Sequence, residues 1–251
     1  MNHQNIFNSI AAICNFFYRK EVPAEHDEEL QFWLSPAAGL LPGLAAAVFG
    51  AVFVFFMGDF SGGIISALVL PLFFEILTGW RGLDAVIAVL DQKLSGKRFT
   101  QISALEKLNV MSRPQTMILF FSVYVFRMVC FGFLAASGNA VWFIYAFGGA
   151  YLIRGELYTD EVPELEDQKY WNWVVYLFCI AAAALLSFHW SAIYSLPVAV
   201  VGTILILIGI RKFFENLSVP HQSWMYDFWG YVAESGLLLI GLILFGRSFN
   251  G

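Results

Sequence analysis

An acid pair opens the last apolar run of the chain, in the segment DFWGYVAESG (residues 227–236). Asp227 and Glu234 are seven residues apart, so in a helix their side chains lie on one face, two turns from each other. A carboxylate inside a bilayer is costly unless a metal ion or a cationic side chain neutralises it. A second pair with the same spacing, Asp84 and Asp91, follows TGWRGL (residues 78–83). The two pairs predict one acidic site at the membrane edge.

The composition is that of a membrane protein. Of 251 residues, 59% are hydrophobic and only 13% are charged, and the mean hydropathy is +0.68. Apolar stretches long enough to cross a bilayer recur along the chain, so we expect a single integral-membrane domain over residues 1–251, surrounded by membrane lipid. No basic stripe is present to neutralise phosphates, so no nucleic-acid partner is expected. The sequence leaves open whether the chain forms a homo-oligomer.

The expected fold is all-α, a polytopic bundle of membrane-spanning helices. Apolar runs predict spans at residues 33–57, 61–78, 114–136, 140–154, 170–188, 193–210 and 229–246. The fourth run is short, which leaves the number of spans at six or seven. Residues 5–18 alternate apolar residues with Asn and Ser at helical spacing, which predicts an N-terminal helix lying in the membrane interface.

Positive residues predict the orientation. Lys and Arg gather in three segments, 79–113, 154–169 and 211–226, and in Arg19 and Lys20 before the first span. With seven spans all of them fall on one face of the membrane, leaving Arg247 on the other. Positive residues favour the cytoplasmic side. We therefore expect a multi-pass protein of the cell (inner) membrane, with the N-terminus and both acid pairs on the cytoplasmic side.

Each acid has two interpretations. Asp84 and Asp91 are either solvated surface acids on a helix at the membrane edge or ligands of a divalent metal, since carboxylate oxygens suit Mg²⁺. Asp227 alone is also a suitable N-cap for the last span. Glu234 lies about two turns into that span, where an unpaired acid is rare. This position favours a functional or an ion-paired role for Glu234.

Two arginines are the candidate positive groups of the site. Arg127 lies near the middle of the third span, where it is suited to pair with a buried carboxylate or with a phosphate. Snorkelling to the surface is not expected so far from the membrane edge, which favours a buried pair. Arg154 follows the fourth span and is either a phosphate-binding residue or a positive anchor.

The arrangement resembles the cobalamin synthase family, the membrane-bound adenosylcobinamide-GDP ribazoletransferases. An interfacial helix before Pro23, and Pro36, Gly39 and Gly43 in the first span, match the start of that family. Its signature Thr-Gly-x-x-His-Leu-Asp-Gly-Leu-Ala-Asp-x-x-Asp-Gly is partly kept in Thr78, Gly79, Leu83, Asp84 and Asp91. Its last span opens Gly-Asp-x-x-Gly-Ala-x-x-Glu, and Asp227, Gly230 and Glu234 fall in register.

The resemblance implies an Mg²⁺-dependent transferase that joins ribazole, or ribazole 5′-phosphate, to adenosylcobinamide-GDP and releases GMP in the last steps of cobalamin biosynthesis. Asp84, Asp91, Asp227 and Glu234 would be the catalytic and Mg²⁺-binding residues, and Arg127 or Arg154 would face the substrate phosphates.

The chain departs from the family pattern in ways that favour a second hypothesis. Ala88 stands where the family has the middle Asp of its signature, Gly82 where it has His, and Gln92 where it has the closing Gly. The alternative is a non-catalytic divergent relative that binds a ligand or scaffolds a membrane complex. A transporter ranks last, because it would need polar residues across several spans and these carry few besides Glu75 and Arg127.

Overall fold

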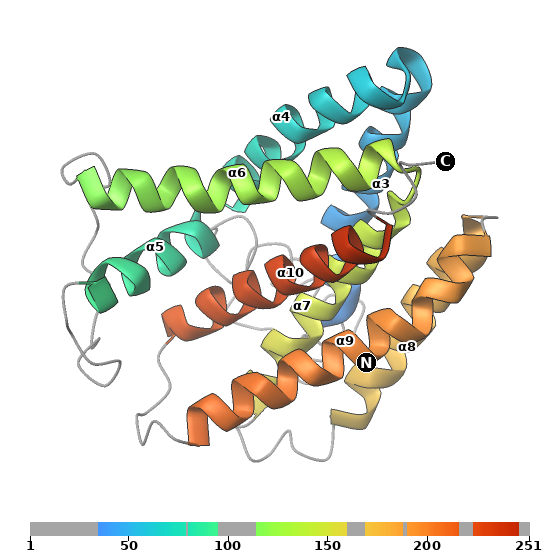
Figure 1. Cartoon of the computed structure of the whole chain (residues 1–251). Coiled ribbons are helices and arrows are strands. Elements are labelled where there is room, and N and C mark those ends of the chain that lie inside the picture. Colours follow the sequence, from blue (N-terminus) through green and yellow to red (C-terminus); the bar gives the residue numbers. More distant parts are fainter. Residues whose placement is uncertain are drawn as a thin grey trace, which may run out of the picture.

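The structure of the chain is a computed structural model, which describes residues 35–78, 80–94, 114–159, 169–187, 190–215 and 223–245. In these ranges the chain is helical and has no strand (Figure 1). The interfacial helix expected at residues 5–18 lies outside the described ranges. The helices are α3 (Ser35–Met57), α4 (Asp59–Thr78), α5 (Arg81–Leu94), α6 (Pro114–Ala136), α7 (Val141–Thr159), α8 (Lys169–Leu186), α9 (Trp190–Glu215) and α10 (Ser223–Phe245).

Six of the described helices are long and apolar enough to cross a membrane: α3, α4, α6, α8, α9 and α10. This confirms the expected all-α, multi-pass architecture. α7 corresponds to the fourth expected span, and it is not among the six. It has 19 residues and carries Arg154 and Glu156 near its end, so it is more polar than the helices around it.

α7 forms the buried centre of the bundle. Every residue from Trp142 to Ile153 is buried, and α3, α8, α9 and α10 all pack against this helix. In Figure 1, α7 runs between α10 and the α8–α9 pair. A helix segment without charged residues, as residues 142–153 are, fits such a position because protein surrounds it on every side. The charged end of α7 is therefore held among other helices.

α3 approaches α7 closely because small residues line its inner face. The buried residues of α3 are Pro36, Ala38, Gly39, Gly43, Ala46 and Gly50. A Cβ atom on Gly43 would lie only 2.7 Å from the Cα of Ile144. Larger α3 side chains such as Leu44 and Phe49 are exposed. Small residues between membrane helices let the backbones pack directly, while large apolar residues face lipid.

A tight bend at Trp80 joins α4 to α5. The φ angle of Trp80 is 62°, in the left-handed region that residues other than glycine rarely adopt. Its N–H donates to the carbonyl oxygen of Glu75 (2.8 Å), and its carbonyl oxygen accepts from the N–H of Asp84 (2.8 Å). One residue thus ends α4 and begins α5. The bend places the start of α5 close to Glu75.

α10 begins at Ser223, six residues before the expected start of the last span. Asp227 is therefore the fifth residue of the helix and lies inside it. The interpretation of Asp227 as an N-cap is wrong, because SWMY (residues 223–226) already forms the first turn. Asp227 and Glu234 consequently lie on one continuous helix, two turns apart, as their spacing predicts.

Candidate functional site

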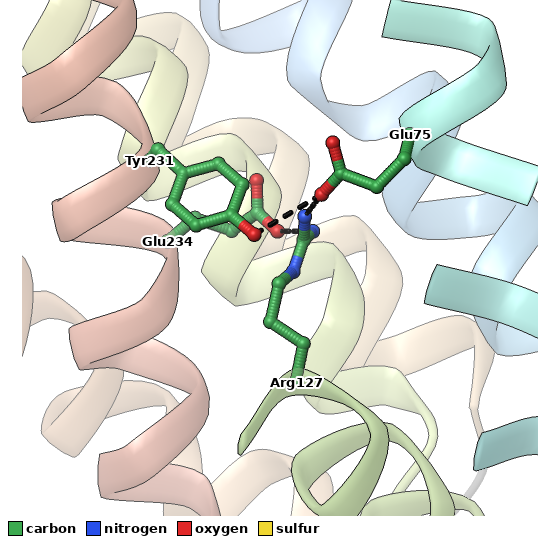
Figure 2. A network of polar contacts seen from close by, with 4 residues as sticks. All are labelled: Glu75, Arg127, Tyr231 and Glu234. Atoms are coloured by element: carbon green, nitrogen blue, oxygen red, sulfur yellow. Dashed lines mark hydrogen bonds and ion pairs between the residues drawn. The ribbon is translucent and has the colours of Figure 1, made fainter. Parts of the chain in front are cut away.

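Arg127 is held between two carboxylates inside the bundle (Figure 2). On α6, its Nη1 atom donates to Glu75 Oε1 of α4 and its Nη2 atom donates to Glu234 Oε1 of α10. The hydroxyl of Tyr231, one turn before Glu234, also donates to Glu75 Oε1 (3.1 Å). We call Glu75, Arg127, Tyr231 and Glu234 the Arg127 cluster. It ties three membrane helices together through side chains that point toward one another.

The Arg127 cluster is almost completely shielded from solvent. The side chains of Arg127, Glu75 and Glu234 are 3%, 1% and 11% exposed. The guanidinium also lies over the ring of Tyr231, with Cζ 4.5 Å from the ring centroid, which adds a cation–π contact. Charged groups at such a position are stable only when they are paired with groups of opposite charge. The ion-paired roles predicted for Glu234 and Arg127 are present in this arrangement.

Arg154 forms a second and looser pair at the start of α10. Its Nη2 atom lies 3.7 Å from Asp227 Oδ1, and the two side chains are 15% and 23% exposed. The Cζ atom lies 4.9 Å from the centroid of the Tyr151 ring. A Cβ atom on residue 230 would overlap Arg154 Nε, so any other residue at this position would displace the Arg154 side chain from its place across α10. Asp227 and Gly230 together therefore determine the position of the Arg154 side chain.

Asp91 and Asp84 lie elsewhere, on α5. Asp91 is buried and accepts hydrogen bonds from Thr116 Oγ1 (3.1 Å) and Gln115 Nε2 (3.3 Å) in the first turn of α6. This side chain joins the end of α5 to the start of α6. Asp84 is exposed in the first turn of α5, where an acid is favourable because the N-terminus of a helix is partly positive.

The described residues contain no group of three or more His, Cys, Asp or Glu side chains that could hold a metal ion. Asp84, Asp91, Asp227 and Glu234 are all described, so the structure does not gather them into one such group. The expected single acidic site is instead divided: Asp91 faces the start of α6, whereas Asp227 and Glu234 each hold an arginine. This arrangement does not fit a magnesium ion held by the four acids together.

Sequence reasoning missed the parts that Glu75 and Tyr231 play. In the sequence Glu75 is recognisable only as one of few polar residues in the spans, and its partner is not evident there. A glutamate in an apolar run together with an arginine in another is itself a signal of pairing. Tyr231 carries no such signal. Its position depends on Gly82, since a Cβ there would lie 2.5 Å from Tyr231 Cδ2.

Gly82 and Tyr231 lie against each other where α5 meets α10. In this chain the tyrosine ring occupies the space beside residue 82 and carries its hydroxyl to Glu75. Another pair missed from the sequence joins Arg211 Nη2 of α9, which is partly exposed, to the buried Glu156 Oε2 of α7 (3.0 Å). Both features fill the centre of the bundle with contacts among the chain's own groups.

Comparison with protein-family models, with curated proteins and with solved structures finds no match to this chain.

Proposed function

We propose that the protein binds a phosphate-bearing ligand at Arg154 and is a non-catalytic relative of the ribazoletransferases. The observation that carries this proposal is the difference between the two arginines. Arg127 is buried and donates to two carboxylates, so it serves the structure. Arg154 is partly exposed, and its ion pair with Asp227 is 3.7 Å long. A phosphate offers a planar guanidinium a stronger, bidentate partner.

The non-catalytic reading is supported by how the acids are used. Glu234 is occupied by Arg127, Asp91 by Thr116 and Gln115, and Ala88 is a buried apolar residue of α5. Phosphoryl transfer relies on groups that neutralise developing charge on the phosphate. Here two of the four predicted acids serve packing and pairing within the protein.

Arg154→Gln is expected to weaken binding of adenosylcobinamide-GDP to the detergent-solubilised protein about 10- to 100-fold. A hydrogen bond to a charged group contributes about 1.5–3 kcal/mol, and Gln keeps polarity without charge. Gly230→Ala should weaken binding as well, because its Cβ displaces Arg154. Lys93→Gln, an exposed change on α5, is the matched control. Unchanged affinity in both Arg154→Gln and Gly230→Ala would rule out this site.

A second candidate is the transferase itself, membrane-bound and acting on adenosylcobinamide-GDP. The register of Asp227, Gly230 and Glu234 with the family motif favours the transferase. Asp227 and Gly230 lie against Arg154, and Glu234 pairs with Arg127. In that reaction a ribose hydroxyl other than the 5′ one, free in ribazole and in ribazole 5′-phosphate alike, loses its proton to solvent, and its oxygen forms a bond to the phosphorus that carries cobinamide. The bond from that phosphorus to the bridging oxygen breaks, and GMP leaves with that oxygen.

The two candidates differ in the release of GMP. Protein reconstituted in lipid with adenosylcobinamide-GDP, ribazole and Mg²⁺ is expected to release none, although it binds the nucleotide-activated substrate. Release of GMP by the wild type, and its loss in Asp227→Asn, would establish the transferase instead. The amide keeps the shape of Asp227 but removes the charge that faces Arg154. A family member that turns over under the same conditions is the positive control.

We also propose that the charged end of the bundle faces the cytoplasm. It holds the end of α4, α5, the start of α6, the ends of α7 and α9 and the start of α10, and nine of the 14 Lys and Arg residues belong to these segments or to the connection between α5 and α6. A single cysteine at Ser95 or Ser218, in a chain without Cys14, Cys130 and Cys179, is expected to resist an impermeant thiol reagent added to intact cells. Labelling before the membrane is opened would reverse the orientation.

A further inference from the structure

A buried tyrosine of α7, Tyr151, contacts the guanidinium of Arg154. The two residues are three positions apart in the helix, so their side chains are neighbours on its surface. The Arg154 Cζ atom lies 4.9 Å from the centroid of the Tyr151 ring, and the guanidinium donates a hydrogen bond to the Tyr151 hydroxyl. Only 6% of Tyr151 is exposed. Tyr151 therefore holds the guanidinium from inside the bundle.

The other contacts of Arg154 hold it less firmly. Its pair with Asp227 is 3.7 Å long, which is beyond the range of a normal hydrogen bond. Its Nε atom is buried against Gly230 and has no hydrogen-bond acceptor in the part of the chain that the structure describes. A guanidinium binds phosphate through two parallel hydrogen bonds only when its plane faces the phosphate. The hydrogen bond to Tyr151 is thus the contact best suited to fix the direction of that plane.

The start of α3 holds Tyr151 in turn. Ser35 Oγ donates to the carbonyl oxygen of Tyr151 (2.9 Å). One turn later in α3, a Cβ atom on Gly39 would lie 2.7 Å from Tyr151 Cδ2 and 2.9 Å from Tyr151 Cβ. The side chain of Tyr151 therefore packs directly on the backbone of α3. Two residues of α3 contact Tyr151, one at its backbone and one at its side chain.

We propose that Tyr151 is the positioning residue of the Arg154 site, and that α3 influences this site through Tyr151. This role rests on the ligand binding proposed for Arg154. Tyr151 acts through Arg154: its ring and hydroxyl hold the guanidinium in the orientation that receives a phosphate. A side chain that is ordered before the ligand arrives loses less conformational entropy on binding, and the complex is correspondingly more stable.

The test is the affinity of full-length variants for adenosylcobinamide-GDP. Tyr151→Phe keeps the ring and removes the hydroxyl, so it should weaken binding about fivefold, the factor that corresponds to one ordinary hydrogen bond. In a chain that already carries Arg154→Gln, the same change should have no further effect, because Tyr151 acts through the guanidinium. Tyr145→Phe is the matched control. Tyr145 is another buried tyrosine of α7, but its hydroxyl bonds to Ser195, so this variant should bind as the wild type does.

Two glycine variants test the part played by α3. A Cβ atom introduced by Gly39→Ala meets the Tyr151 side chain, whereas one introduced by Gly43→Ala meets the backbone of Ile144 and Phe143. Both changes crowd the contact between α3 and α7, so both should lower the midpoint of thermal unfolding. Only Gly39→Ala should also weaken binding, to about the extent of Tyr151→Phe.

Unchanged binding in Tyr151→Phe, where Arg154→Gln weakens it, would overturn the role of Tyr151 and leave the ligand site intact. An equal loss in Tyr145→Phe, or a further loss when Tyr151→Phe is added to Arg154→Gln, would reveal a general packing effect and overturn this role as well. Equal binding by the two glycine variants would exclude an influence of α3. Unchanged binding in both Arg154→Gln and Gly230→Ala would instead overturn the ligand site, and the role of Tyr151 with it.

Discussion

Replacing Arg127 with methionine is expected to lower the free energy of unfolding by about 3–5 kcal/mol, the cost of breaking a buried pair by removing one partner. The change leaves Glu75 and Glu234 facing each other inside the bundle without a counter-charge. Reversible denaturation in detergent micelles, or the midpoint of thermal unfolding, measures the loss.

A set of related variants shows whether charge is the cause. The triple change Arg127→Met, Glu75→Gln and Glu234→Gln removes all three charges, so it should regain most of the lost stability. Arg154→Met should cost less, because Arg154 and Asp227 are partly exposed and 3.7 Å apart. If Arg127→Met proves no worse than Arg154→Met, the Arg127 cluster does not hold the bundle together.

Gly43→Leu is expected to destabilise the bundle by about 3 kcal/mol, the upper end of the usual cost of overpacking, because the close contact forces backbone shifts. The new Cβ would meet the Cα of Ile144 and the carbonyl oxygen of Phe143, at 2.7 and 2.9 Å. Both are backbone atoms that no side-chain rotation can move away, so α3 and α7 must separate.

Gly209→Leu is the matched control, since a Cβ atom at that position meets no heavy atom. In neutral detergent it should keep or slightly raise the stability, because glycine in a helix interior costs about 0.5–1 kcal/mol relative to alanine. Equal losses in Gly43→Leu and Gly209→Leu would show that close packing of α3 on α7 is not what Gly43 provides.

The fold was largely predictable from the apolar runs. Seven runs predicted six or seven spans, and six helices in the described part of the chain are long and apolar enough to cross a membrane; the predicted bounds lie within a few residues of those of α3, α4, α6 and α8. The start of α10 was missed because Ser223 to Tyr226 are more polar than the run that follows, and hydropathy alone does not register a helix that continues beyond the apolar segment.

The candidate site was predictable only in part. Spacing placed Asp227 and Glu234 on one helix face, and the mid-span position of Arg127 predicted a buried pair. Asp84 and Asp91 have the same spacing as Asp227 and Glu234, but the two pairs do not lie together. Spacing fixes the positions of side chains within one helix and does not determine how two helices are rotated relative to each other. Asp91 therefore faces Thr116. The contact between Gly82 and Tyr231 depends on two helices meeting, which one sequence cannot reveal.

The polarity of α7 has a consequence for how the chain is made. A nascent segment enters the bilayer on its own when its apolar residues outweigh its charges, and α7 bears Arg154 and Glu156 at the end synthesised last. The residues that neutralise them, Asp227 and Arg211, follow more than 50 residues later in the chain. During translation the end of α7 can therefore pack into the bundle only after α9 and α10 have been synthesised. A ribosome-stalled chain that stops before α9 should have an α7 that protease cleaves, whereas in a chain that includes α10 this helix should be protected.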